Sequence, residues 1–351
     1  MDAVFPFGFP SATAFYLAVY VLTLAVHVVF MNYVLAGSAI VAGSALMRRD
    51  ERVVRVLKDW LPVMLSGAIT AGVAPLLFIQ ILYKQAFYTA NLLLFHRWML
   101  ILPVLIVGFY ALYLMKSGWL SRRRGWARAA VTAVPFATIA FVGYSWTENH
   151  LLSLRDRAYW VDFYAGDRPV HTEPQLVPRL LVWACGSVPT LAALLAWQAW
   201  YRGWHDERKG LARLAFAGFA LTGAASLIYW LAAPEQVSAI SSPMALPYFI
   251  AACAGLVIQA GSWAAVWRAG LSTRALTVIS IGLAMTIVGM TVCREAVRLQ
   301  AVGADAFERL YPLHRDAAAK GGLPIFVSFL VLNAGLIGLC FVLVRRGTRA
   351  A

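Results

Sequence analysis

The stretch that decides the fold runs from Thr13 to Met47 and reads TAFYLAVYVLTLAVHVVFMNYVLAGSAIVAGSALM. It contains no Asp, Glu, Lys or Arg, and it is longer than the roughly 20 apolar residues that a helix needs to cross a bilayer. Near its middle lies His27. Because an unpaired ionisable group in hydrocarbon costs on the order of a few kcal/mol, such a residue points to function. The stretch therefore predicts a transmembrane helix with a functional histidine.

The rest of the chain repeats this apolar pattern. Of 351 residues, 61% are hydrophobic and only 13% are charged, which excludes an ordinary water-soluble domain. Helices are expected because lipid cannot satisfy backbone polar groups, and a barrel would alternate apolar and polar residues. We predict an all-α polytopic bundle forming a single integral membrane domain over residues 1–351. Its nine spans are Thr13 to Met47, Trp60 to Tyr83, Trp98 to Met115, Ala129 to Thr147, Leu180 to Tyr201, Leu214 to Ala233, Pro243 to Trp267, Ala275 to Cys293 and Gly321 to Val344.

Charge predicts the orientation of these spans. With the amino terminus outside and the carboxyl terminus inside, 19 of the 30 Lys and Arg residues fall in inner loops. The inner side then has a net charge of +14 and the outer side a net charge of zero, a strong positive-inside pattern. The basic clusters are short and each joins two spans, so they predict topology and not nucleic-acid binding. We expect a multi-pass protein of the bacterial cytoplasmic (inner) membrane.

His27 is the first candidate site residue. On a helical projection it shares its face with apolar and aromatic side chains, among them Tyr20, Phe30 and Val34. Such surroundings suit a haem iron ligand better than a hydrated ion path. Three roles stay open: metal ligand to a b-type haem, neutral imidazole hydrogen-bonded to a neighbouring helix, or proton relay.

The other histidines gather on the outer side. His96 begins the third span and His150 ends the fourth, so the two are candidates to approach one another and bind a cofactor near the outer surface. His171 and His314 lie in long outer segments, whereas His205 is on the inner face. The alternative is that His96 and His150 are polar interface residues.

Glu295 and Arg298 complete the candidate cofactor site. They are one helical turn apart at the outer end of the eighth span, which predicts a shared face and a local ion pair. At an outer cofactor edge, the acid could pass protons and the arginine could hold a haem propionate or polarise a quinone carbonyl. This helix is expected to continue as a polar segment and break at Tyr311 and Pro312. The outer segments 148–179 and 294–320 are candidate partner-docking or membrane-surface segments, with ordinary solvated loops as the alternative.

Four motifs, taken in order, resemble subunit I of the cytochrome bd-type quinol oxidases. Val26 to Phe30 resembles the first-helix pattern that contains that family's haem-ligating histidine. Ile69 to Tyr83 is similar to the second helix and its aromatic outer turn, and Tyr144 to Asn149 to the end of the fourth. Glu295 to Gln300 resembles the eighth-helix signature, in which a glutamate precedes a Gly-Arg-Gln-Pro-Trp run. The resemblance implies nine spans, an outer amino terminus, and haem b or quinone as cofactor.

The chain also departs from this family. Trp98 to Met115 lacks the acidic pair expected near the oxygen-reducing haem, and Leu180 and Leu181 stand where a haem histidine would be expected. The outer loop Pro234 to Ser242 is too short for the family's quinol-binding loop. The glycine, proline and tryptophan of the eighth-helix signature are missing around Arg298. Oxygen reduction by this chain alone is therefore not expected.

The sequence predicts a subunit of a bacterial respiratory electron-transfer complex, acting within a quinol or cytochrome oxidoreductase complex and not as an enzyme alone. Its expected partners are the lipid bilayer, other membrane subunits and a periplasmic multihaem c-type cytochrome. One alternative is a cofactor-free structural subunit of such a complex. A transporter is disfavoured, because intramembrane charges are scarce and no inverted repeat is evident.

Overall fold

The computed structural model describes residues 5–47, 52–117, 120, 125–320, 324–332, 335 and 339. Within these residues, eight helices are long and apolar enough to cross a membrane, so the protein is a polytopic helical bundle. They are α1 (Ser11–Leu46), α2 (Arg52–Leu82), α4 (Phe95–Leu114), α6 (Gly125–Leu152), α8 (Leu176–Tyr201), α9 (Arg208–Ala232), α11 (Leu246–Ala269) and α12 (Thr273–Val302).

These eight helices correspond in order to the first eight predicted spans, which confirms the all-α class. The ninth predicted span, Gly321 to Val344, lies largely outside the described residues. Its part at 324–332 is helical, and the ring of Phe326 contacts that of Phe78 on α2, with 5.0 Å between ring centroids.

Short helices join the ends of the long ones. On the predicted outer side, α3 (Lys84–Leu93) joins α2 to α4, and α7 (Arg157–Ala165) lies between α6 and α8. After α12 come α13 (Ala304–Glu308) and α14 (Tyr311–Ala319). The connection between α9 and α11 holds α10 (Pro234–Val237) and η2 (Ser238–Ser241), and η1 (His205–Glu207) precedes α9.

The break after α12 differs from the prediction. The helix ends at Gly303, whose φ of 82° is a conformation that favours glycine. Tyr311 and Pro312, expected to break a helix, instead begin α14. The reason is that proline lacks an N–H, which a helix interior needs but a first turn does not.

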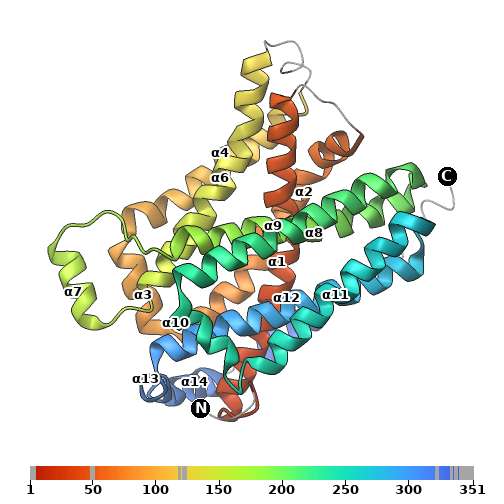
Figure 1. The fold of residues 1–351 in the computed structure, drawn as a ribbon. Helices are drawn as coiled ribbons and strands as arrows, with labels where there is room; N and C mark the ends of the chain where they lie inside the picture. Colours follow the sequence, from red (N-terminus) through yellow and green to blue (C-terminus); the bar gives the residue numbers. More distant parts are fainter. Residues whose placement is uncertain are drawn as a thin grey trace.

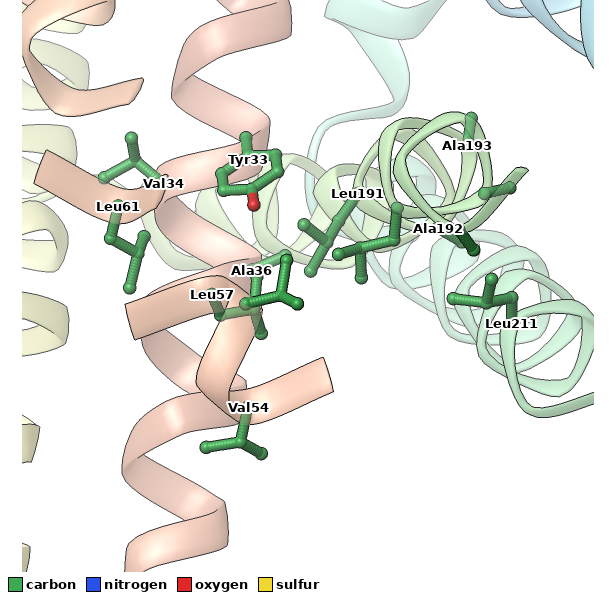
Figure 2. Close-up of a cluster of buried hydrophobic side chains, with 14 of the residues drawn as sticks. Tyr33, Val34, Ala36, Val54, Leu57, Leu61, Leu191, Ala192, Ala193 and Leu211 are labelled. Carbon is green, nitrogen blue, oxygen red and sulfur yellow. The ribbon is translucent and has the colours of Figure 1, made fainter. Parts of the chain in front are cut away.

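Helix α1 is central to the bundle. It contacts α2, α6, α8 and α12, and in Figure 1 it runs up the middle while α8, α9, α11 and α12 cross it. One apolar core packs α1 and α2 against α8 and α9, through residues such as Tyr33, Leu57, Leu191 and Leu211 (Figure 2). A second core lies toward the outer end and includes Tyr16, Phe78 and Phe307.

Small residues let α11 and α12 approach closely. A Cβ atom on Gly255 of α11 would lie 2.5 Å from the carbonyl oxygen of Gly282 on α12. This is the close backbone approach that glycine permits between membrane helices. The α11–α12 pair therefore supports α12, whose outer end contains Glu295 and Arg298.

Candidate functional site

A buried polar cluster of five residues joins α6, α8, α12 and the junction of α2 with α3 at the outer end of the bundle. Glu295 and Arg298 lie on α12, His150 near the end of α6, and Arg179 in the first turn of α8. Tyr83 lies between α2 and α3, and each of these five side chains is at most 5% exposed. The expected proximity of Glu295 to Arg298 is present, with 3.5 Å between Glu295 Oε2 and Arg298 Nη1. We call these five residues the outer cluster.

His150 lies between two guanidinium groups. Its Nε2 is 3.1 Å from Nη2 of Arg179, and its Nδ1 contacts Nη2 of Arg298. A guanidinium nitrogen can only donate hydrogen bonds, and a neutral imidazole has a single acceptor nitrogen. One of the two contacts therefore sets a donor against a donor. The arrangement lacks a hydrogen-bond acceptor.

The remaining contacts do not supply this acceptor. The Tyr83 hydroxyl donates a hydrogen bond to Glu295 Oε1, and its ring lies beneath the Arg298 guanidinium, 4.7 Å from ring centroid to Cζ. Arg179 Nη1, Arg298 Nη1 and Glu295 Oε2 are buried without a hydrogen-bond partner. Buried polar atoms are nearly always hydrogen-bonded, to protein or to ordered water, so these two arginine donors and one carboxylate acceptor leave room for a water or a ligand.

A third arginine increases the positive charge of this region. Arg294 Nη1 donates to the hydroxyl of Tyr20 on α1 at 3.1 Å, and its guanidinium lies over the Trp183 ring at 5.3 Å. Its Nε is buried without a partner. Three guanidinium groups thus lie in this region, and among the described residues the Glu295 carboxylate is within ion-pair distance of Arg298 alone. Because buried charges are stable only when paired, the cluster favours an anionic ligand.

Tyr83 is the titratable group of the cluster that lies outside the spans. Burial, together with the Glu295 carboxylate, raises the pKa of Tyr83 well above its ordinary value. The phenol is therefore protonated and available as a donor at neutral pH.

A second polar group ties the segment after α7 to α6. Glu148, fully buried, accepts from the backbone N–H of His171 at 2.8 Å and pairs with Arg97 at 3.1 Å. The His171 ring contacts Glu173 at 2.8 Å, and Glu173 also pairs with Arg155 at 2.9 Å. Burial acts to raise the pKa of Glu173, but hydrogen bonds from His171 and Gln175 and the Arg155 charge outweigh it and lower that pKa. This group fixes part of the outer segment 148–179 against the bundle.

His27 lies apart from the outer cluster, packed against α2. Its Nδ1 lies 2.9 Å from the backbone carbonyl oxygen of Ala68, to which it donates. The ring rests on Gly72, where a Cβ would lie 2.9 Å from His27 Cε1. The hydrogen bond to a neighbouring helix, which was one of the three roles left open, is therefore present. This bond uses Nδ1 of His27, and among the described residues Nε2 has no hydrogen-bond partner.

The structure brings together some of the predicted site residues and not others. His150, Glu295 and Arg298 meet in the outer cluster. His96 does not join His150: it is exposed, and its ring lies against that of Phe95, 5.7 Å away between centroids. Both ring nitrogens of His150 contact arginines, so the structure gives no support to the His96–His150 approach, and the alternative of polar interface residues stays open.

Sequence analysis missed two members of the cluster, Arg179 and Tyr83, as site residues. Arg179 lies just before the predicted start of the fifth span, where a charged side chain is expected to be solvated. In the described part of the chain there is no group of three or more His, Cys, Asp or Glu residues that could hold a bare metal ion.

Comparisons with known proteins give no relative. No family model, no curated protein and no solved structure matches the chain. The function must therefore be argued from the site itself.

Proposed function

We propose that the protein is an integral membrane subunit of a bacterial respiratory electron-transfer complex, with an arrangement similar to subunit I of cytochrome bd-type oxidases. One observation carries the proposal: His150 lies between two guanidinium groups that have no shared acceptor. A cofactor with carboxylate arms would supply the acceptors that Arg179 and Arg298 lack, as bidentate arginine–carboxylate pairs do.

A b-type haem fits this requirement and also the geometry of His27. A metal-ligating histidine usually donates its other ring N–H to a carboxylate or a backbone carbonyl, which fixes the tautomer. His27 does this through Ala68 and leaves the Nε2 lone pair free to bind iron. Tyr20, the partner of Arg294, precedes His27 by seven residues on α1, or about 10 Å along the helix axis. The imidazole would thus be able to ligate the iron of such a haem, and the arginines would be able to bind its carboxylates.

A quinone fits the outer cluster less well. Its carbonyl oxygens could accept from the arginines, and Tyr83 with Glu295 could exchange protons with the outer side. A neutral head group, however, brings no negative charge to the three guanidinium groups. The charge therefore favours haem carboxylates over a quinone in this cluster.

The proposal includes electron exchange with an outer partner because the outer cluster lies near the predicted outer surface. The cluster lies at the predicted outer end of α6 and α12, near the segments 148–179 and 294–320, so a periplasmic multihaem c-type cytochrome is the proposed partner. Helix α4 contains no Asp or Glu, and residues 234–241 form only short helices. Both facts weigh against oxygen reduction by this chain alone. We propose that the protein holds haem within the assembled complex, where the haem would supply one-electron chemistry.

Cofactor content tests the proposal. Protein extracted gently from its native membrane is assayed for haem by the pyridine haemochrome spectrum and for quinone by solvent extraction. We expect haem, with occupancy reduced about tenfold or more in Arg179→Met and Arg298→Met, because a hydrogen bond to a charged group contributes about 1.5–3 kcal/mol. Arg309→Met, an exposed arginine on the same side, is the control. A fully folded protein with neither cofactor would instead support the cofactor-free structural subunit.

A further inference from the structure

A groove runs between α3 and α7 on the predicted outer side, away from the outer cluster. Its volume is about 510 Å³, within the size range of ligand sites in proteins. Gln85, Thr89 and Leu93 line it from α3, and Arg157, Trp160, Val161 and Tyr164 line it from α7. Figure 1 shows α7 projecting at the side of the bundle, beside α3.

The groove is preformed because two side chains of α7, Trp160 and Phe163, hold this helix against the bundle. Trp160 Nε1 donates to the carbonyl oxygen of Leu152 at 2.8 Å, and Phe163 is buried beside Ala90 and Leu94. Asp156 caps the helix by accepting from the Tyr159 N–H at 2.9 Å. A ligand would therefore find the walls already in place.

The walls are apolar where they face outward. Val161 is 57% exposed and Tyr164 79%, and Leu92, the neighbour of the lining residue Leu93 on α3, is 73% exposed. Met99 and Leu102 on α4 are exposed as well, and they face lipid if α4 crosses the membrane. Tryptophan and tyrosine beside an apolar surface are typical of the membrane–water interface. The groove thus lies where acyl chains meet head groups.

One cation faces this apolar surface without a counter-ion. Among the described residues, the Arg157 guanidinium has no hydrogen bond or ion pair, unlike Arg155, which pairs with Glu173. The side chains of Gln85 and Thr89 likewise have no hydrogen-bond partner in the described part of the chain. Together they offer a guanidinium, a hydroxyl and an amide, all of which donate to phosphate oxygens.

We propose that the α3–α7 groove binds a phospholipid of the outer leaflet, with its phosphate on Arg157 and an acyl chain along Leu93, Trp160 and Val161. This site is independent of any cofactor at the outer cluster. A phospholipid is the occupant that matches both Arg157, the exposed cation of the groove lining, and the exposed apolar side chains Val161 and Tyr164. A lipid here would also fill the space between the two outer helices.

Brominated phosphatidylglycerol tests the proposal, because bromine on the acyl chain quenches tryptophan fluorescence at contact. The delipidated full chain in detergent is titrated with this lipid, and Trp160→Phe identifies the quenching that comes from residue 160. We expect Arg157→Ala to raise the half-saturating lipid concentration about tenfold or more, by loss of a charge-assisted hydrogen bond. Arg168→Ala, an exposed arginine beyond α7 that does not line the groove, should leave it unchanged.

Three outcomes would overturn the proposal. The first is equal half-saturation in Arg157→Ala and the unchanged chain, and the second is quenching that is unaltered by Trp160→Phe. The third is displacement of the lipid by millimolar inorganic phosphate, because a free anion could then fill the site without acyl chains. Thr89→Ala, which retains the helix and the charge, provides a second variant should Arg157→Ala fold poorly.

Discussion

Replacing Gly72 with alanine should displace the His27 ring. A Cβ at residue 72 would lie 2.9 Å from His27 Cε1 and 3.0 Å from Nδ1, closer than packed atoms tolerate. The imidazole must then move and lose its 2.9 Å bond to the Ala68 carbonyl. Overpacking and the lost hydrogen bond together should lower the free energy of unfolding by about 2–4 kcal/mol. If His27 ligates haem, cofactor occupancy should fall as well.

Two glycines provide matched controls for this variant. Gly67→Ala overpacks the same α1–α2 interface, with its Cβ 2.6 Å from Phe30 Cε1, but does not approach His27. Gly261→Ala on α11 meets no atom within 4 Å. Thermal unfolding in detergent should show a loss of stability in Gly72→Ala and Gly67→Ala only, and haem per folded protein should fall only in Gly72→Ala. If Gly72→Ala were as stable as Gly261→Ala, the packing argument would be refuted; equal haem in Gly72→Ala and Gly67→Ala would refute the role of His27.

Three further predictions follow from the same contacts. Glu295→Gln removes the carboxylate of the outer cluster and should lower the free energy of unfolding of the apoprotein by about 3–5 kcal/mol, measured by thermal or denaturant unfolding. The control Glu308→Gln replaces an exposed acid and should change this free energy by less than about 0.5 kcal/mol. Gly255→Ala on α11 should destabilise the bundle by about 1–3 kcal/mol relative to Gly261→Ala on the same helix, because its Cβ would meet the Gly282 carbonyl at 2.5 Å; equal unfolding midpoints would contradict this close approach. Burial lowers the pKa of His314, whose Nδ1 accepts a hydrogen bond from Thr13 at 2.8 Å, so the ring is neutral in the folded protein. The free energy of unfolding should therefore be constant above about pH 6.5 and fall as the pH drops below that value. His314→Gln should reduce this fall.

Apolar length predicted the fold because the membrane imposes it. Lipid requires long uninterrupted helices, so the run from Thr13 to Met47 could be assigned to α1 with its ends nearly right. The ends of other spans were less accurate. α6 continues to Leu152 and α8 begins at Leu176, beyond the predicted limits of Thr147 and Leu180. The predicted spans end next to the first charged residue, which is Glu148 on α6 and Arg179 on α8. Both side chains are buried, Glu148 against Arg97 and Arg179 against His150.

The site was predictable only where its contacts are local. Glu295 and Arg298 are three residues apart on one helix, so their proximity follows from helical geometry. The contact of His150 with Arg179 and that of Tyr83 with Glu295 join separate helices. Nothing in the spacing of those residues along the chain indicates which helix ends meet. The same limit explains why the sequence left open whether His96 lies beside His150.

The central claim is that His27 and the outer cluster together hold an electron-carrying cofactor. The most direct measurement is the reduced-minus-oxidised absorption spectrum of protein purified from its native membrane, compared with His27→Ala and with Gly67→Ala as a packing control. We expect a b-type Soret and α band in the unchanged chain and in the folded fraction of Gly67→Ala, and loss of both bands in His27→Ala. Full bands in His27→Ala, or no reducible band in the folded unchanged chain, would contradict the account.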